Sequence, residues 1–174
     1  MKILVLNGSP RKNGNTAAMV DAFKEGAAGN GHEVNVIRVY DKKIGACLAC
    51  EYCHEKSDGI CVQKDDMQEI YEAMKETDML VLASPVHYWY LSAPLQAAIT
   101  RFYSVNEDIM SGIKKTAMLL SSGSPGVYDA IIKAYNDSFI DYLGFEDMGV
   151  ITAYEDQNQS PEKLAECKAF GASL

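Results

Sequence analysis

The sequence predicts one α/β domain in which helices cover both faces of a parallel β-sheet. Two observations support this fold class: apolar runs alternate with helix-like stretches along the 174 residues, and the runs are apolar at almost every position. Strands of that kind are buried on both faces, as in parallel sheets covered by helices. The length is sufficient for a core without disulfides or metal ions. We therefore expect residues 1–174 to form a single domain.

The first part of the chain is predicted to form a strand, a helix and a second strand. Ile3–Leu6 is an apolar run that ends at a polar turn. Apolar residues recur at helical spacing over Asn15–Ala28, and a Gly-Asn-Gly sequence closes this helix. Glu33–Tyr40 alternates between apolar and polar residues, which favours a strand. Residues 41–64 have no clear period and are expected to form a loop that contains cysteines.

The elements that follow continue the alternation. Asp66, with Glu69 three residues later, resembles a capping box and predicts a helix through Lys75. Met79–Ala83 is an apolar run that we expect to end at the Ser-Pro pair after it. The remaining elements are predicted as a helix over Ser92–Tyr103, a strand over Thr116–Ser121, a helix from Ser124-Pro125 to Leu143, a strand over Phe145–Ala153 and a helix from Ser160-Pro161.

In parallel sheets of this kind, ligands bind beyond the carboxyl ends of the strands, at the point where the strand order reverses. The loop after the first strand has suitable groups for a phosphate. Ser9, Asn15 and Thr16 offer short polar side chains next to a helix N-terminus, and Arg11 and Lys12 add positive charge. The alternative interpretation is a polar turn in which the serine and the threonine only cap the helix.

The loop after the third strand contains His87, Tyr88, Trp89 and Tyr90. Aromatic side chains at the expected ligand site favour a flat, mostly apolar ring. Alternatively, these aromatics only pack against the rest of the protein. The histidine could donate a proton to a substrate, or it could simply be solvated.

These loops carry a family resemblance. The sequence Gly-Ser-Pro-Arg-x-x-Gly-Asn-Thr from Gly8 resembles the FMN phosphate loop of the NADPH-dependent FMN reductase family, within the flavodoxin-like superfamily. The resemblance covers Met1 to about Ala153. It implies a flavodoxin-like three-layer sandwich with a five-stranded parallel sheet of order 2-1-3-4-5.

The resemblance extends to the other two loops. Ser-Pro-Val-x-Tyr-Trp is similar to the flavin-ring loop of the family, although His87 stands where related loops more often carry tyrosine. The small residues of Ser121–Ser124 are similar to the loop on the other side of the ring. No catalytic side chain is required, because the flavin itself carries the redox chemistry. The expected FMN-binding residues are Ser9, Arg11, Lys12, Asn13, Gly14, Asn15, Thr16, Pro85, Val86, His87, Tyr88, Trp89, Ser122 and Gly123.

Four of the five cysteines follow the pattern Cys47-x2-Cys50-x2-Cys53-x7-Cys61. Thiols clustered in this way indicate metal or redox chemistry rather than a disulfide framework. The spacing resembles that of iron–sulfur flavoproteins, which implies that these four residues hold a 4Fe–4S cluster beside FMN. The alternatives are free thiols, a disulfide or zinc. Cys167 has helical spacing with apolar neighbours and is expected to be buried.

The composition excludes several function classes. The formal net charge of −8 and the lack of a basic stripe argue against a nucleic-acid partner. No apolar stretch is long enough to cross a bilayer, and no secretory signal is apparent, so we expect a cytoplasmic protein that does not interact with membranes.

The expected function is that of an FMN-dependent oxidoreductase. Electrons would pass from NAD(P)H or ferredoxin to a flavin, a quinone or a similar acceptor. The first alternative is an iron–sulfur flavoprotein that carries electrons without a substrate of its own. The second is a redox-sensing module whose cysteine loop responds to oxidation. Aromatic residues beside an exposed ring predict a homodimer or homotetramer.

Overall fold

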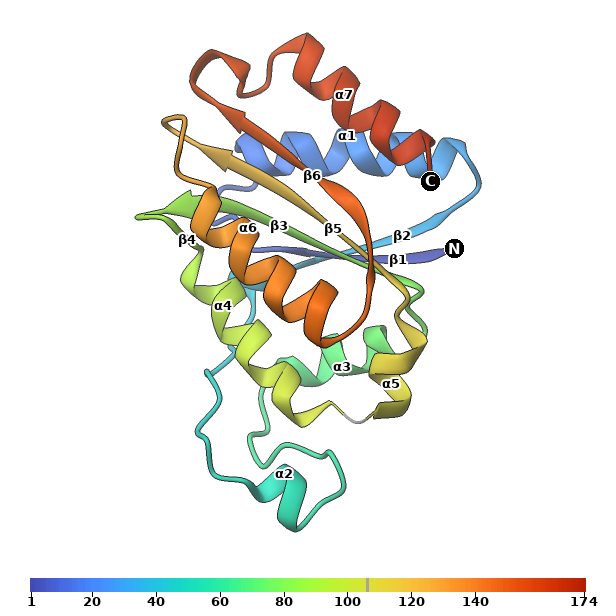
Figure 1. Ribbon diagram of the computed structural model, residues 1–174, viewed down its shortest axis with the longest axis vertical. Helices are drawn as coiled ribbons and strands as arrows, with labels where there is room; N and C mark the ends of the chain where they lie inside the picture. The colour runs from blue at the N-terminus through green and yellow to red at the C-terminus, as the bar shows by residue number, and fades with distance from the viewer. Residues whose placement is uncertain (106) are drawn as a thin grey trace.

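The computed structural model describes residues 1–105 and 107–174 and contains a central parallel sheet (Figure 1). Its strands are β1 (Lys2–Asn7), β2 (Glu33–Arg38), β3 (Met79–His87), β5 (Lys115–Ser122) and β6 (Glu146–Tyr154). They pair in the order β2-β1-β3-β5-β6, and every pair is parallel. This is the predicted order 2-1-3-4-5, since the short strand β4 (Tyr90–Leu91) lies beside β3 outside this path. The order reverses between β1 and β3.

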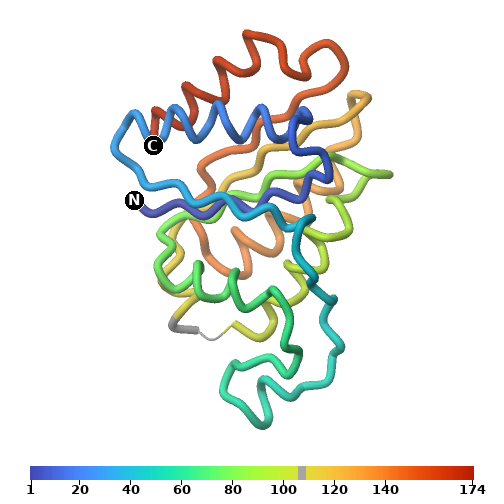
Figure 2. The backbone as a smooth tube through the Cα atoms, turned by 180° about the vertical axis from the view of Figure 1, so that it is seen from behind, coloured from blue at the N-terminus to red at the C-terminus, as the bar shows by residue number. Residues whose placement is uncertain are grey.

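Helices cover both faces of the sheet (Figures 1 and 2). One face carries α1 (Asn15–Gly29) and α7 (Pro161–Ala172). The helices of the other face are α3 (Met67–Met74), α4 (Ala93–Thr100), α5 (Glu107–Gly112) and α6 (Asp129–Tyr135). Alternate strand residues belong to two separate cores: Leu4 and Leu6 pack towards α3 and α4, whereas Ile3 and Val5 pack towards α1. This alternation explains why the strands are apolar at almost every position.

Close packing of α1 against α7 depends on two glycines. A Cβ atom on Gly26 would lie 1.9 Å from the carbonyl oxygen of Lys168, and one on Gly171 would lie 2.2 Å from that of Phe23. Both distances are far below van der Waals contact, so neither position has room for a side chain. Cys167 is fully buried in the same layer, as the sequence predicts.

The predicted end of β3 and the predicted capping box are both wrong. The strand continues through Ser84-Pro85 to His87, because Val86 and His87 pair with β4 in an antiparallel hairpin. Helix α3 begins after Asp66, but no side chain caps it. The Asp66 carboxylate instead accepts a hydrogen bond of 2.7 Å from the backbone N–H of Lys43. A tertiary contact thus takes the acceptor that a capping box needs.

The long helix predicted from Ser124-Pro125 is shorter than expected and irregular. Helix α6 begins only at Asp129, because Gly126 has a φ of +73° and interrupts any helix that starts earlier. Residues Asn136–Tyr142 then continue α6 as a π-helical segment. The helix predicted over Ser92–Tyr103 is α4 followed by the 3-10 turn Arg101–Ser104.

The cysteine loop, residues 41–64, projects from the layer that contains α3 and α4 (Figure 1). Its only regular element in the structure is the short helix α2 (Tyr52–Glu55). Non-glycine residues with positive φ, Ala49 at 49°, Glu51 at 56° and Asp58 at 48°, turn the chain sharply around this helix. Among the described residues, no helix is long and apolar enough to cross a membrane.

Candidate functional site

A polar cavity of about 310 Å³ lies at the carboxyl ends of β1, β3 and β5, where the strand order reverses. This is the place that the topology predicts for a ligand. The residues that line it are Ser9, Pro10, Arg11, Gly14, Asn15, Thr16, Pro85, Val86, His87, Ser121, Ser122, Gly123 and Asn158. The structure therefore brings together residues from all three loops that the sequence analysis selects.

The N-terminus of α1 opens into this cavity without a side-chain cap. Gly14 is the N-cap residue, and the first turn contains no acidic residue. The first intrahelical hydrogen bond runs from the N–H of Ala18 to the carbonyl of Gly14, at 3.0 Å. Backbone N–H groups at the start of a helix, together with the helix dipole, favour an anion. The capping role considered for Ser9 and Thr16 is therefore wrong, because neither side chain caps α1.

The two hydroxyl groups are instead held in place by other contacts. Thr16 Oγ1 lies 2.7 Å from Ser121 Oγ, and both residues are buried. Ser9 Oγ accepts a hydrogen bond of 3.3 Å from the N–H of Arg11. The N–H of Ser9 donates to the side-chain oxygen of Asn7 at 2.9 Å. These bonds fix the shape of the loop around the helix N-terminus.

The β3–β4 hairpin forms a second wall of the cavity. The Ser84 hydroxyl accepts from the N–H of Ser92 at 2.9 Å and donates to the carbonyl of Pro85 at 2.8 Å, which anchors the base of the hairpin. Tyr88 and Trp89 form its tip with φ values of 53° and 66°. Their rings contact each other edge to face, with centroids 5.6 Å apart. Both are exposed to solvent, at 86% for Tyr88 and 52% for Trp89.

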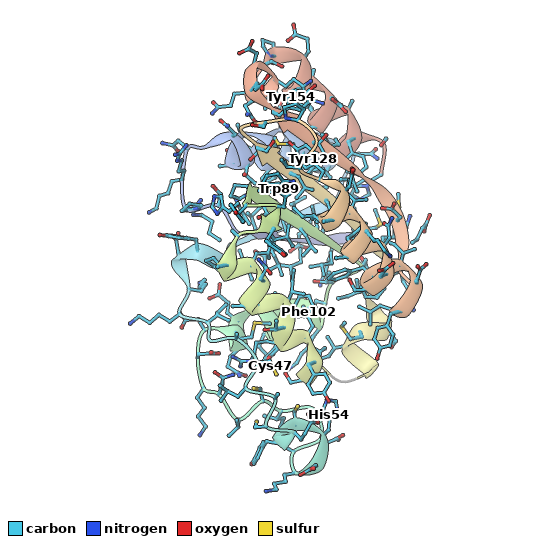
Figure 3. All side chains as sticks on the ribbon, turned by 60° about the vertical axis from the view of Figure 1, so that its left-hand side comes forward. Cys47, His54, Trp89, Phe102, Tyr128 and Tyr154 are labelled. Atoms are coloured by element: carbon cyan, nitrogen blue, oxygen red, sulfur yellow. The ribbon has the colours of Figure 1, made fainter. Side chains whose placement is uncertain are left out.

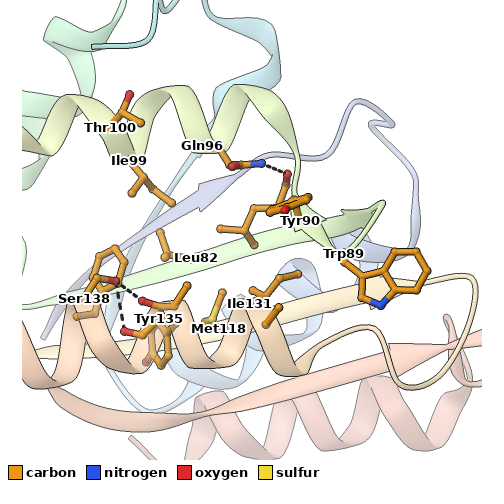
Figure 4. Close-up of a pocket in the computed structure, with 14 residues that line it drawn as sticks. Leu82, Trp89, Tyr90, Gln96, Ile99, Thr100, Met118, Ile131, Tyr135 and Ser138 are labelled. Carbon is orange, nitrogen blue, oxygen red and sulfur yellow. Dashed lines mark hydrogen bonds between the residues drawn. The ribbon is translucent and has the colours of Figure 1, made fainter. Parts of the chain in front are cut away.

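Four of the expected FMN-binding residues do not line the polar cavity: Lys12, Asn13, Tyr88 and Trp89. Trp89 lines a second, apolar cavity of about 230 Å³ between α4 and α6 (Figure 4). The floor of this α4–α6 groove includes Leu82 and Met118. This groove was not expected from the sequence.

Asn158, in the loop after β6, also lines the polar cavity, although its sequence position did not predict it. Its Nδ2 donates to the carbonyl of Ser122 at 2.7 Å, and the adjacent Gln159 donates to the side-chain oxygen of Asn15 at 2.8 Å. These bonds attach the loop after β6 to the end of β5 and to the start of α1. Parallel strands place all their carboxyl ends at one edge of the sheet. A polar residue that follows the fifth predicted strand could therefore have been expected near the ligand site.

The four clustered cysteines line a separate small cavity of about 10 Å³ in the cysteine loop. Figure 3 labels one of them, Cys47, in this loop. All are free thiols; Cys50 is exposed, Cys47 and Cys61 are half-buried, and Cys53 is buried. Burial raises the pKa of the Cys53 thiol above its usual value. His54 is not among the residues that line this cavity; its Nε2 lies 2.8 Å from the carbonyl oxygen of Tyr103, and its ring packs on the ring of that tyrosine.

Four thiols around one cavity form a donor set whose chemistry fits an iron–sulfur cluster. Among the described residues, however, no three His, Cys, Asp or Glu side chains are arranged to hold a metal ion. The loop thus collects the four thiols without assembling them as ligands.

Comparisons with known proteins find similar sequences over most of the chain. The family model described as NADPH-dependent FMN reductase matches residues 1–153. An iron-sulfur flavoprotein of Methanocaldococcus jannaschii is 30% identical over 146 residues, which cover 80% of this chain and 71% of that protein. One of Archaeoglobus fulgidus is 41% identical over 101 residues, which cover 58% of this chain and 45% of that protein. The chain spans about half the length of several curated relatives that it matches.

The fold is also similar to that of solved structures. An NAD(P)H:quinone oxidoreductase from Methanothermobacter marburgensis matches with a TM-score of 0.74 and 18% identity, over 100% of this chain and 96% of that one. At this identity the likeness concerns the fold, which is flavodoxin-like. Since the family model covers most of the chain, the chain belongs to the NADPH-dependent FMN reductase family.

Proposed function

We propose that this protein is an FMN-dependent oxidoreductase that accepts electrons from NAD(P)H or ferredoxin and passes them to a flavin, a quinone or a similar acceptor. The observation that carries the proposal is the uncapped N-terminus of α1, which opens into a polar cavity beside Arg11. That combination suits the phosphate of a mononucleotide. When bound there, FMN supplies the hydride and electron chemistry that the side chains lack.

In this proposal the phosphate lies at the start of α1. Ser9, Thr16 and Asn15 donate hydrogen bonds to it, and Arg11 neutralises its charge; Lys12, Asn13 and Gly14 complete the loop. The hairpin and the loop after β5 hold the ring from two sides, through Pro85, Val86 and His87 on one side and Ser122 and Gly123 on the other. Tyr88 and Trp89 lie at its outer edge, where they shield the ring from solvent.

The four cysteines are proposed as the ligands of a 4Fe–4S cluster, which supplies single-electron steps. The support is their convergence on one cavity and the curated relatives, which are named iron-sulfur flavoproteins. We further propose a homodimer that buries the α4–α6 groove, and a cytoplasmic location, in which the five cysteines form no disulfide.

Spectroscopy and turnover test the function. Anaerobically purified protein should bind FMN more tightly than riboflavin, because riboflavin lacks the phosphate that α1 is proposed to hold. The loaded protein should oxidise NAD(P)H continuously when a quinone or free FMN is supplied in excess. Binding of FMN without continuous turnover by NAD(P)H or reduced ferredoxin would favour the alternative, an electron carrier with no substrate of its own. Equal affinity for FMN and riboflavin would contradict the phosphate site.

A further inference from the structure

Arg101 is a buried cation beneath the cysteine loop. It begins the 3-10 turn after α4 and is 1% exposed; among the described residues it is the only charged residue that is fully buried. Burying a charge is costly unless it is paired and hydrogen-bonded. A buried arginine outside the polar cavity therefore requires an explanation.

Its guanidinium joins the two ends of the loop. Nη1 donates to the carbonyl of Gly45 at 3.0 Å and to Asp65 Oδ2 at 2.8 Å, and Nη2 donates to Asp65 Oδ1 at 3.3 Å. Asp65 Oδ2 also accepts the N–H of Gly45 at 3.0 Å. Gly45 precedes all four clustered cysteines in the sequence and Asp65 follows them, so these contacts form a closed neck.

Other contacts at the neck are more exposed. Gln63 Nε2 donates to the carbonyl of Ala46 at 3.0 Å, and an ion pair joins Lys42 to Glu69. Exposed pairs of this kind contribute little to stability, at most about 1 kcal/mol. In the Arg101–Asp65 pair, by contrast, the arginine side chain is 0% exposed and the aspartate side chain 17%. Arg101 therefore makes the most deeply buried contact at the neck, which two hydrogen bonds between Lys43 and Asp66 also join.

Arg101 also lines the cavity that the four cysteines share. Its Nε is buried and has no hydrogen-bond partner among the described residues. An N–H donor left without an acceptor in a buried position is unfavourable, which favours an acceptor that binds in the cavity. Thiolates and inorganic sulfide are anionic acceptors of the kind that this donor set would supply.

We propose that Arg101 is a positioning residue of the cysteine site. Its Nη atoms hold the neck closed, and its Nε donates a hydrogen bond to a thiolate or sulfide of the anionic group that the four cysteines bind. The identity of that group, a 4Fe–4S cluster, rests on the proposed function. The role of Arg101 in closing the neck does not. A hydrogen bond to a cluster sulfur stabilises the reduced, more negative form, so Arg101 raises the reduction potential.

The neck is tested in the full-length protein without metal, by hydrogen exchange of backbone amides. Arg101→Lys keeps the charge but lacks the Nε–H and the fork that spans Gly45 and Asp65. It should speed exchange across residues 46–64 by about tenfold or more, while β1, β3 and β5 keep their protection. Glu69→Gln removes the exposed ion pair with Lys42, which also joins the two ends of the loop, and this control should exchange as the wild type does. If Arg101→Lys does not fold, Asp65→Asn tests the same neck. Unchanged exchange in the loop, or equal acceleration throughout the chain, would overturn this role.

The hydrogen bond is tested after anaerobic reconstitution with iron and sulfide. Arg101→Lys should lower the midpoint potential of the cluster relative to wild type and to Glu69→Gln, and should bind less iron and sulfide per chain. An unchanged potential would refute the Nε–H donor. Failure of the wild type to bind iron, together with the expected exchange pattern, would refute the cluster but support the neck.

Discussion

Thr16 Oγ1 lies 2.7 Å from Ser121 Oγ and so joins the first turn of α1 to the carboxyl end of β5 across the candidate FMN site. The two hydroxyls have one proton each, and the bond between them uses only one. The other proton is therefore available to a ligand oxygen in the adjoining cavity, which Thr16 and Ser121 both line. The contact thus both shapes the loop and leaves a donor for the phosphate.

We expect Ser9→Ala combined with Thr16→Ala to weaken FMN binding without loss of the fold. A hydrogen bond to a charged group contributes about 1.5–3 kcal/mol, so each lost bond should reduce affinity by about tenfold or more. Fluorescence titration of the apoprotein measures this effect. Ser173→Ala, which removes an exposed hydroxyl at the end of α7, serves as a control and should bind FMN as wild type does. Wild-type affinity in the double variant would argue against the phosphate site.

We expect Gly26→Ala to destabilise the protein strongly. The added Cβ would meet the carbonyl oxygen of Lys168 at 1.9 Å, so α1 and α7 would have to separate. Overpacking costs about 1–3 kcal/mol, and the upper end is expected because the obstructing atom belongs to the backbone. Gly29 is the matched control on the same helix, since a Cβ there meets nothing within 4 Å. Urea unfolding should give Gly29→Ala a stability equal to or slightly above that of wild type.

The sheet could be predicted from the sequence because its strands pack on both faces. Leu4 and Leu6 belong to one core and Ile3 and Val5 to the other, so the run is apolar throughout and its identity as a buried strand is clear. The loop after β1 was equally clear, because polar and basic residues gather between a buried strand and a helix.

The β3–β4 hairpin and the part of the site in the loop after β6 could not be predicted in the same way. Tyr88 and Trp89 adopt positive φ without a glycine to indicate the turn, so local sequence gives no sign that β3 pairs with β4. Asp66 was expected to cap a helix but bonds to Lys43, which lies 23 residues away in the chain. Asn158 reaches the site only because β6 ends beside β5. Each of these contacts depends on tertiary structure.

A wild-type dimer should dissociate on introduction of charge into the α4–α6 groove. Ala134 lines the groove and is exposed, so Ala134→Glu adds a carboxylate without disturbing the core. In a dimer that buries this face, the two added charges would be desolvated in an apolar surface. Light scattering should then give the mass of a monomer for Ala134→Glu and of a dimer for wild type. Ala165→Glu, on the opposite layer in α7, is the control and should remain dimeric. A monomeric wild type would contradict the proposed assembly.

Cys167 should be the least reactive thiol of the native protein. Burial raises its pKa to about 11 and the residue is fully buried. At pH 8 only about one thousandth of this thiol would be ionised, and the reactive form is the thiolate. Mass spectrometry after brief alkylation should find Cys50 modified and Cys167 intact, with Cys167 becoming reactive only in denaturant. Modification of native Cys167 at the rate of Cys50 would disprove its burial.

Cys47, Cys50, Cys53 and Cys61 should behave as one ligand set. A cubane requires a thiolate on each iron, so the loss of any one of them should destabilise the cluster. Five single Cys→Ala variants, reconstituted anaerobically, are compared by iron and acid-labile sulfide per chain. The four loop variants should be low in both, whereas Cys167→Ala should match wild type, because that residue lies in α7 away from the loop.

The same measurement separates the cluster from other uses of the thiols. Zinc at one ion per chain without sulfide would indicate a structural metal site, which also uses thiolate ligands. Wild type that stays free of metal after reconstitution would refute the cluster and leave an FMN reductase with four free thiols. Because the described thiols share a cavity without forming a metal-binding group, cluster assembly should also slow hydrogen exchange in residues 46–64. Reconstitution that raises iron content without changing exchange in the loop would place the iron elsewhere.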